Sequence, residues 1–147
     1  MHNIETLNTF LKDELSATET YQQALDKLRE EAGLGESKDL RPIYEDHKEA
    51  ASILQTLISR MGGTPCEDSG AWGTWAKIVQ GSANLLGKEA ALKSLQGGEQ
   101  SGADAYAEAL QEAGLSSEII SLIETKLLPA QQSHIRTLDR LSSAETE

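Results

Sequence analysis

The spacing of apolar residues is the feature that most restricts the fold, because they recur every three or four positions along four long stretches. This spacing places them on one stripe of an α-helix. The sequence therefore predicts four helices, over residues 4–32, 40–61, 88–113 and 117–142. Glycines follow the first three stretches, at Gly33, Gly62 and Gly114. Glycine readily adopts the left-handed conformation that ends a helix.

Individual residues predict where two of these helices begin and where one is interrupted. Asp39 is a suitable N-cap for the second helix and places Pro42 in its first turn, where a missing N–H costs nothing. Ser116 or Ser117 caps the fourth helix. Pro129 lies inside the fourth helix and is expected to kink it or to remove one backbone hydrogen bond.

Residues 62–87 separate the first two helices from the last two. They start as a loop and then carry Trp72 and Trp75, which we expect on a short extra helix that covers the ends of the main helices. The chain, residues 1–147, is interpreted as a single domain. Two antiparallel helical hairpins joined by a long crossover predict an all-α fold, an up-down four-helix bundle that resembles the ferritin-like layout.

The charge balance argues against several classes of partner. The chain has 13 Lys and Arg residues against 24 Asp and Glu residues, a formal net charge of -11. Such a protein repels nucleic acid phosphates and anionic lipid surfaces. No run approaches the roughly 18 to 20 apolar residues of a membrane helix, and the first residues lack the layout of a secretory signal. We therefore expect a cytoplasmic protein that binds neither nucleic acid nor membrane, in which the single cysteine, Cys66, forms no intrachain disulfide.

A polar pattern occurs twice on stripes that are otherwise apolar. Glu14 precedes Tyr21 by the same spacing with which Glu99 precedes Tyr106, and each tyrosine is followed by the same Ala-Leu pair. Both hairpins also turn on the phrase Glu-Ala-Gly-Leu. Internal duplication of a helical hairpin explains both repeats.

The other two stripes carry one histidine each, His47 and His134. A carboxylate in the core of a bundle needs a partner, so the histidines and a metal ion are both candidates. Glutamate and imidazole suit iron, manganese or zinc. Ferritin-like carboxylate bundles use one Glu from each of two helices and a Glu-x2-His pair from each of the other two. Resemblance to them makes Glu14, Glu99, His134 and His47 candidate metal ligands.

The companion glutamates of that pattern are absent, since Tyr44 and Gln131 stand three residues before the two histidines. The alternative is therefore a polar core without metal, in which Tyr21, Tyr106, Gln131 and Tyr44 hydrogen-bond with the glutamates and histidines.

Residue counting from the turns gives an expectation for each hairpin. Glu99 and His134 are expected at a similar height along the bundle axis. Glu14 and His47 are expected to differ in height by about 15 Å, because the second helix is taken to start near residue 40. Tyr21 is the better match for His47. The other acidic residues, among them Asp46 and Glu49, are expected on a solvated face.

Several short pieces resemble an uncharacterised bacterial family of ferritin-like four-helix proteins, described only as a domain of unknown function. These pieces are Leu7-Asn8 with Tyr21, Met61-Gly-Gly-Thr-Pro65, Trp72-Gly-Thr-Trp75, Gly98-Glu99 with Tyr106, and His134 with Leu138. The resemblance implies the fold and self-association, and it implies no agreed activity.

Two functional hypotheses follow. The first is a non-catalytic structural or stress-associated bundle, a homo-oligomer with a metal-free polar core. The alternative is a ferritin-like protein that binds iron or manganese at a degenerate di-metal site. The sequence has no phosphate-binding loop and no nucleophile motif, so it predicts no catalytic residue and names no small-molecule substrate.

Overall fold

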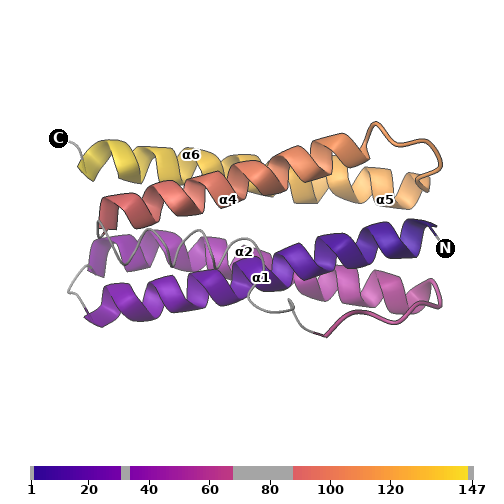
Figure 1. Cartoon of the computed structure of the whole chain (residues 1–147), viewed down its shortest axis with the longest axis horizontal. Helices are drawn as coiled ribbons and strands as arrows, with labels where there is room; N and C mark the ends of the chain where they lie inside the picture. The colour runs from indigo at the N-terminus through magenta and orange to yellow at the C-terminus, as the bar shows by residue number, and fades with distance from the viewer. Residues whose placement is uncertain (1, 31–33, 68–87, 146–147) are drawn as a thin grey trace.

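The computed structural model describes residues 2–30, 34–67 and 88–145, and these residues form an all-helical bundle (Figure 1). Residues 31–33 and 68–87, which contain the predicted Gly33 stop and the predicted tryptophan helix, lie outside the described residues. The helices are α1 (His2–Glu30), α2 (Leu34–Arg60), α4 (Lys88–Ala109), α5 (Ser117–Leu122) and α6 (Leu128–Glu145). A π-helical segment, Ile123–Leu127, joins α5 to α6.

The described helices form two pairs, in which α1 packs along α2 and α4 packs along α6 (Figure 1). The helices of each pair run in opposite directions, whereas α2 and α4 run in the same direction. Buried contacts agree with this, because Leu40 and Leu92, near the starts of α2 and α4, belong to one apolar cluster. Leu57 and Tyr106, near the ends of these helices, belong to the other cluster. The predicted all-α bundle is confirmed at this level.

Two helix boundaries differ from the prediction of helices at 40–61 and 88–113. Helix α2 begins at Leu34, so Asp39 is not its N-cap and Pro42 lies inside the helix. Pro42 is exposed, and a carbonyl that loses its helical partner at an exposed site can bond water instead. Helix α4 ends at Ala109 rather than at 113, and the next residues form turn-type hydrogen bonds.

The fourth helix of the bundle is interrupted, as Pro129 predicted, although the form of the interruption was not foreseen. The Ser116 side chain accepts a hydrogen bond from the Ile119 N–H and so caps α5. The Leu128 N–H then bonds to the Ile123 carbonyl, five residues earlier, directly before Pro129. A local π turn is one way in which a helix accommodates a proline. Helix α6 continues to Glu145, beyond the predicted end at 142.

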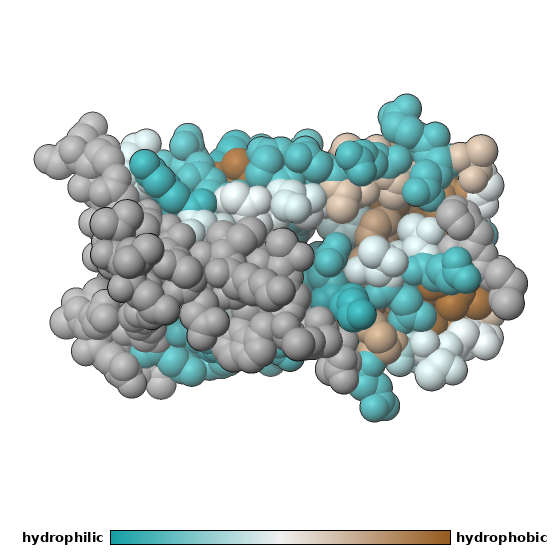
Figure 2. All heavy atoms as spheres, viewed as in Figure 1, coloured by the Kyte–Doolittle hydropathy of each residue, from teal (hydrophilic) through white to brown (hydrophobic). Residues whose placement is uncertain are grey.

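The core consists of two apolar clusters, one toward each end of the bundle. The first includes Leu7, Leu54 and Ile119, and the second includes Leu25, Leu40 and Leu138. On the face shown in Figure 2, hydrophobic atoms collect toward the end that holds α5 and the N-terminus, and hydrophilic side chains line the upper edge. None of the described helices is long and apolar enough to cross a membrane.

Substitutions at two glycines test the backbone conformation at an ordinary helical position and at a left-handed one. Gly97 lies exposed inside α4, and Gly114 has φ +93 in the turn before α5; an added Cβ meets nothing within 4 Å at either site. We expect Gly97→Ala to stabilise the protein by about 0.5–1 kcal/mol, because alanine loses less backbone entropy. Gly114→Ala is expected to destabilise it by about 1–2 kcal/mol, the cost of left-handed backbone with a Cβ. Urea unfolding measures both, and shifts of the same sign would contradict the prediction.

Candidate functional site

A layer of polar side chains crosses the middle of the bundle between the two apolar clusters. Each of the four long helical segments contributes one buried group: Glu14 from α1, His47 from α2, Glu99 from α4 and His134 from α6. Tyr21 and Tyr106 flank the layer, the former within one apolar cluster and the latter within the other. The helical periodicity of the sequence places these residues on the inner stripes.

Glu99 is the centre of the layer and has no exposed surface (0 %). Its Oε2 accepts a hydrogen bond from the Tyr21 hydroxyl at 2.7 Å and lies 2.7 Å from the His47 Nε2. Its Oε1 lies 3.0 Å from the His134 Nδ1. The Gln131 amide donates to the Glu99 backbone carbonyl at 3.0 Å. Glu99 is thereby held by three other helical segments.

Glu14 lies on the opposite side of the His47 ring. Its Oε2 is 2.7 Å from the His47 Nδ1, and its Oε1 accepts a hydrogen bond from the Tyr106 hydroxyl at 2.6 Å. The expected height difference of about 15 Å between Glu14 and His47 is therefore wrong. Because α2 begins at Leu34, His47 lies 13 residues beyond that start, and Glu14 lies 16 residues before the end of α1.

The contacts repeat between the two hairpins, apart from one difference. In each hairpin the histidine Nδ1 meets the glutamate of the same hairpin, and each tyrosine donates to the glutamate of the other. The Nε2 atoms break this symmetry, since that of His47 meets Glu99 and that of His134 meets Asp46. The paired contacts are those expected of a duplicated hairpin.

Buried charges set the protonation of the layer. Burial lowers the pKa of His47, but the Glu99 and Glu14 carboxylates outweigh it and hold that pKa well above 6.5. Burial raises the pKa of Glu99, and the charges and hydrogen bonds of His47 and His134 outweigh this and lower it to about 2. Burial and the neighbouring carboxylates raise the pKa of Tyr21 and of Tyr106 well above 10, so both phenols remain donors.

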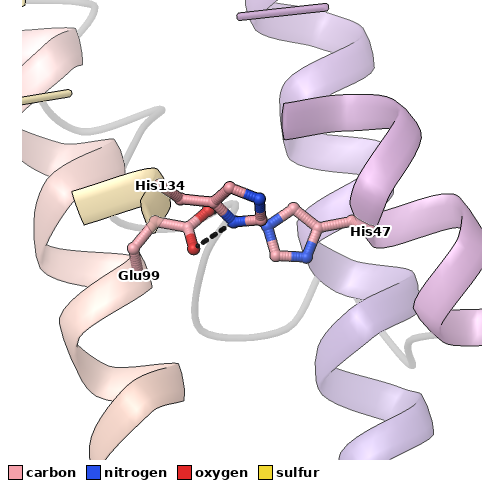
Figure 3. Close-up of side chains that lie close together, drawn as sticks. All are labelled: His47, Glu99 and His134. Carbon is pink, nitrogen blue, oxygen red and sulfur yellow. Dashed lines mark hydrogen bonds and ion pairs between the residues drawn. The ribbon is translucent and has the colours of Figure 1, made fainter. Parts of the chain in front are cut away.

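Three of the four predicted metal ligands converge. His47, Glu99 and His134 each offer one donor atom within 4.8 Å of the other two, and Figure 3 shows the three side chains meeting in the interior from separate helices. Bonds of about 2.0–2.2 Å place two ligands of one ion at most about 4.4 Å apart, so small side-chain shifts would close the set. Two histidines and one carboxylate form a ligand set used for iron and zinc.

The second nitrogen of each histidine has its own carboxylate. The His47 Nδ1 lies against Glu14, and the His134 Nε2 lies 2.8 Å from the Asp46 Oδ2. Metal-binding histidines in proteins generally donate their other N–H to such a carboxylate, which fixes the tautomer and the orientation of the ring. The residues present therefore fit a divalent cation, with Glu14 and Asp46 as partners of the ligands.

The other sequence-predicted residues take different places. Glu14 lies outside the converging set of three. Gln131 is buried but bonds to backbone, and an added Cβ at Gly102 would collide with its amide. Tyr44 is half-buried at the edge of an apolar cluster, with the Lys48 ammonium 5.3 Å from its ring centre. Neither side chain takes the place of a bridging carboxylate among the described contacts.

Asp46 is the site residue that sequence reasoning missed. The sequence predicts a position on the solvated face, and the Asp46 side chain is indeed 51 % exposed, yet it pairs with buried His134. The available signal was chemical, because a buried histidine has two ring nitrogens and each needs a partner. The sequence alone did not indicate which acidic residue on a neighbouring helix would supply it.

Comparison with known proteins identifies a family and no activity. A family model described as a domain of unknown function, DUF2383, matches residues 2–112. No curated protein and no solved structure is significantly similar to the chain. The match spans α1, α2 and α4, which carry Glu14, His47 and Glu99, three of the four glutamates and histidines of the polar layer. The chain belongs to the DUF2383 family of domains of unknown function.

Proposed function

We propose that this protein is a ferritin-like four-helix bundle that binds one divalent transition-metal ion, of the iron or manganese class, through His47, Glu99 and His134. The observation that carries the proposal is the orientation of the two histidines. Each directs one nitrogen at Glu99 and the other at a separate carboxylate. The parallel course of α2 and α4 across a long connection supports the ferritin-like layout.

A divalent cation is compatible with the charges of the layer. Without metal, the nitrogens of both histidines face carboxylates, so His47 must carry two protons, and its positive charge offsets one of the two buried glutamates. If a divalent cation replaces the Nε2 proton, the charges of Glu14, Glu99 and the ion sum to zero with both histidines neutral. Binding therefore competes with a proton at His47 and should strengthen as pH rises.

Each residue has a defined part in this proposal. Glu99, His47 and His134 would hold the ion, Glu14 and Asp46 would orient the two rings, and Tyr21 would hold the Glu99 carboxylate through its hydroxyl. A bound ion of this class supplies Lewis acidity or redox chemistry. The missing bridging glutamates argue for one ion rather than two.

The second candidate function is a structural bundle that acts through its surface with a metal-free core. The observation that favours it is that the glutamates, histidines and tyrosines of the layer already form hydrogen bonds with one another. Such a network fixes helix register without any ligand. Self-association and a cytoplasmic location stay predictions from the sequence, and light scattering would test the first.

Metal analysis separates the two candidates. Protein purified without an affinity tag and exposed to Fe(II) without oxygen, or to Mn(II), is expected to retain about one ion per chain after desalting. Because the metal binds only the folded state, the free energy of unfolding of the protein should rise by about 2.7 kcal/mol when the free metal concentration is a hundred times Kd. Less than a tenth of an equivalent of any transition metal, with no stabilisation, would exclude the metal-binding function and favour the structural one.

A further inference from the structure

The buried layer is connected to the surface at one side, between α2 and the π-helical segment. A pocket of about 80 Å³ is lined at its inner end by Glu14, His47 and His134, and toward solvent by Asp46, Glu49 and Lys126. At about 30 Å³ per water molecule, this volume holds two to three waters. The pocket thus has the volume for a cation that has lost part of its hydration shell.

A second, smaller pocket approaches the layer between α1 and α4. Asp13, Gly102 and Tyr106 are among its lining residues, and its volume is about 10 Å³. This is room for no more than a single water. Of the two approaches among the described residues, the one on the α2 side is therefore the larger.

Side chains at the wider approach link solvent to the cluster. Asp46 is half exposed and lies against the Nε2 of His134, so one carboxylate contacts both water and the layer. Lys126, from the π-helical segment, lies 2.8 Å from the Glu49 carboxylate of α2, and both side chains are about half exposed. This ion pair spans the two elements that border the pocket.

We propose that divalent cations reach the buried ligands through this pocket. Asp46 transfers the cations inward, and the Lys126–Glu49 ion pair closes the pocket toward solvent. The inference rests on the proposed metal-binding function and adds a path and its control to it. A cation approaching from solvent meets the half-exposed carboxylates of Asp46 and Glu49, of which only Asp46 also contacts His134, while the ammonium of Lys126 opposes its entry. Opening the ion pair removes that opposition.

The test is the rate at which metal-free protein takes up Co(II), followed by stopped-flow absorbance. Co(II) is a suitable probe because it binds such sites more tightly than Mn(II) or Fe(II). Lys126→Glu is expected to raise the second-order rate about tenfold at low salt, because charge at a cleft mouth steers ions. The gain should vanish at 1 M salt, where the screening length is about 3 Å. Asp46→Asn is expected to slow uptake about tenfold.

Lys12→Glu is the matched control, because it makes the same charge change beside Asp13, which lines the smaller pocket. It should alter the rate less than twofold. Two results would overturn the route and leave the metal site intact. The first is an equal change in uptake rate for Lys126→Glu and Lys12→Glu. The second is an unchanged rate for Lys126→Glu while one equivalent of Co(II) still binds. Failure of the unaltered protein to take up any Co(II) would overturn the site and the route together.

Discussion

Replacing Glu99 with alanine is expected to destabilise the metal-free protein by about 3–5 kcal/mol and to abolish metal binding. Glu99 is fully buried and accepts hydrogen bonds from Tyr21, His47 and His134. Its removal leaves three donors without an acceptor and leaves the His47 charge with one carboxylate instead of two. Breaking a buried ion pair by removing one partner typically costs this amount.

Urea unfolding in the presence of a chelator measures the stability change, and metal analysis after Mn(II) loading measures binding. Glu108→Ala is the control, because Glu108 is an exposed glutamate on the same helix; it should change stability by less than about 0.5 kcal/mol. Glu99→Gln keeps the shape of the side chain and removes its charge, so it should lose metal with a smaller loss of stability. A Glu99→Ala protein as stable as the parent would show that the carboxylate is merely tolerated in the core.

Replacing His47 with alanine is expected to destabilise the metal-free protein by about 3–5 kcal/mol near neutral pH. The ring lies between two carboxylates at 2.7 Å on either side, and without it Glu14 and Glu99 repel each other in a buried site. Burial and the like charge would then raise the pKa of at least one carboxyl, which would take up a proton. The deficit relative to the parent should therefore shrink as pH falls from 7 toward 4.

The parent protein should lose stability on both sides of an intermediate pH range in the same buffers. Because the pKa of His47 is raised above 6.5 in the folded state, its contribution is complete below about pH 6.5 and is lost as pH rises through the folded pKa. Because the pKa of Glu99 is lowered from 4.5 to about 2, its contribution is present above about pH 4.5 and is lost as pH falls toward 2. Metal-free protein should thus be most stable between these limits.

Urea midpoints at several pH values, with chelator present, test both profiles. Glu45→Ala, a change at an exposed acidic neighbour on α2, is the control and should follow the parent curve. A His47→Ala deficit that stays constant from pH 7 to 4 would mean that the ring contributes packing rather than charge. A parent profile that rises steadily above pH 6.5 would contradict the assigned protonation of His47.

Much of the fold and part of the site could be predicted from the sequence, because helical periodicity depends on local order along the chain. The apolar stripes predicted the all-helical bundle and placed Glu14, Glu99, His47 and His134 on its inner faces. Caps were less certain. Ser116 caps α5, whereas Asp39 lies inside α2, which begins five residues earlier and holds Pro42 at an exposed position.

The pairing of atoms in the polar layer was decided only by the tertiary structure. The start of α2 at Leu34 brings His47 level with Glu14, and the six-residue error in that boundary moved the predicted height by about 9 Å. Asp46 reaches His134 across helices, a contact that leaves no periodic signal in either segment. The sequence by itself determined which residues face inward, since that depends on the repeat of one helix. Which of them meet depends on the relative height and rotation of four helices, and these are set by turns, packing and the π-helical segment.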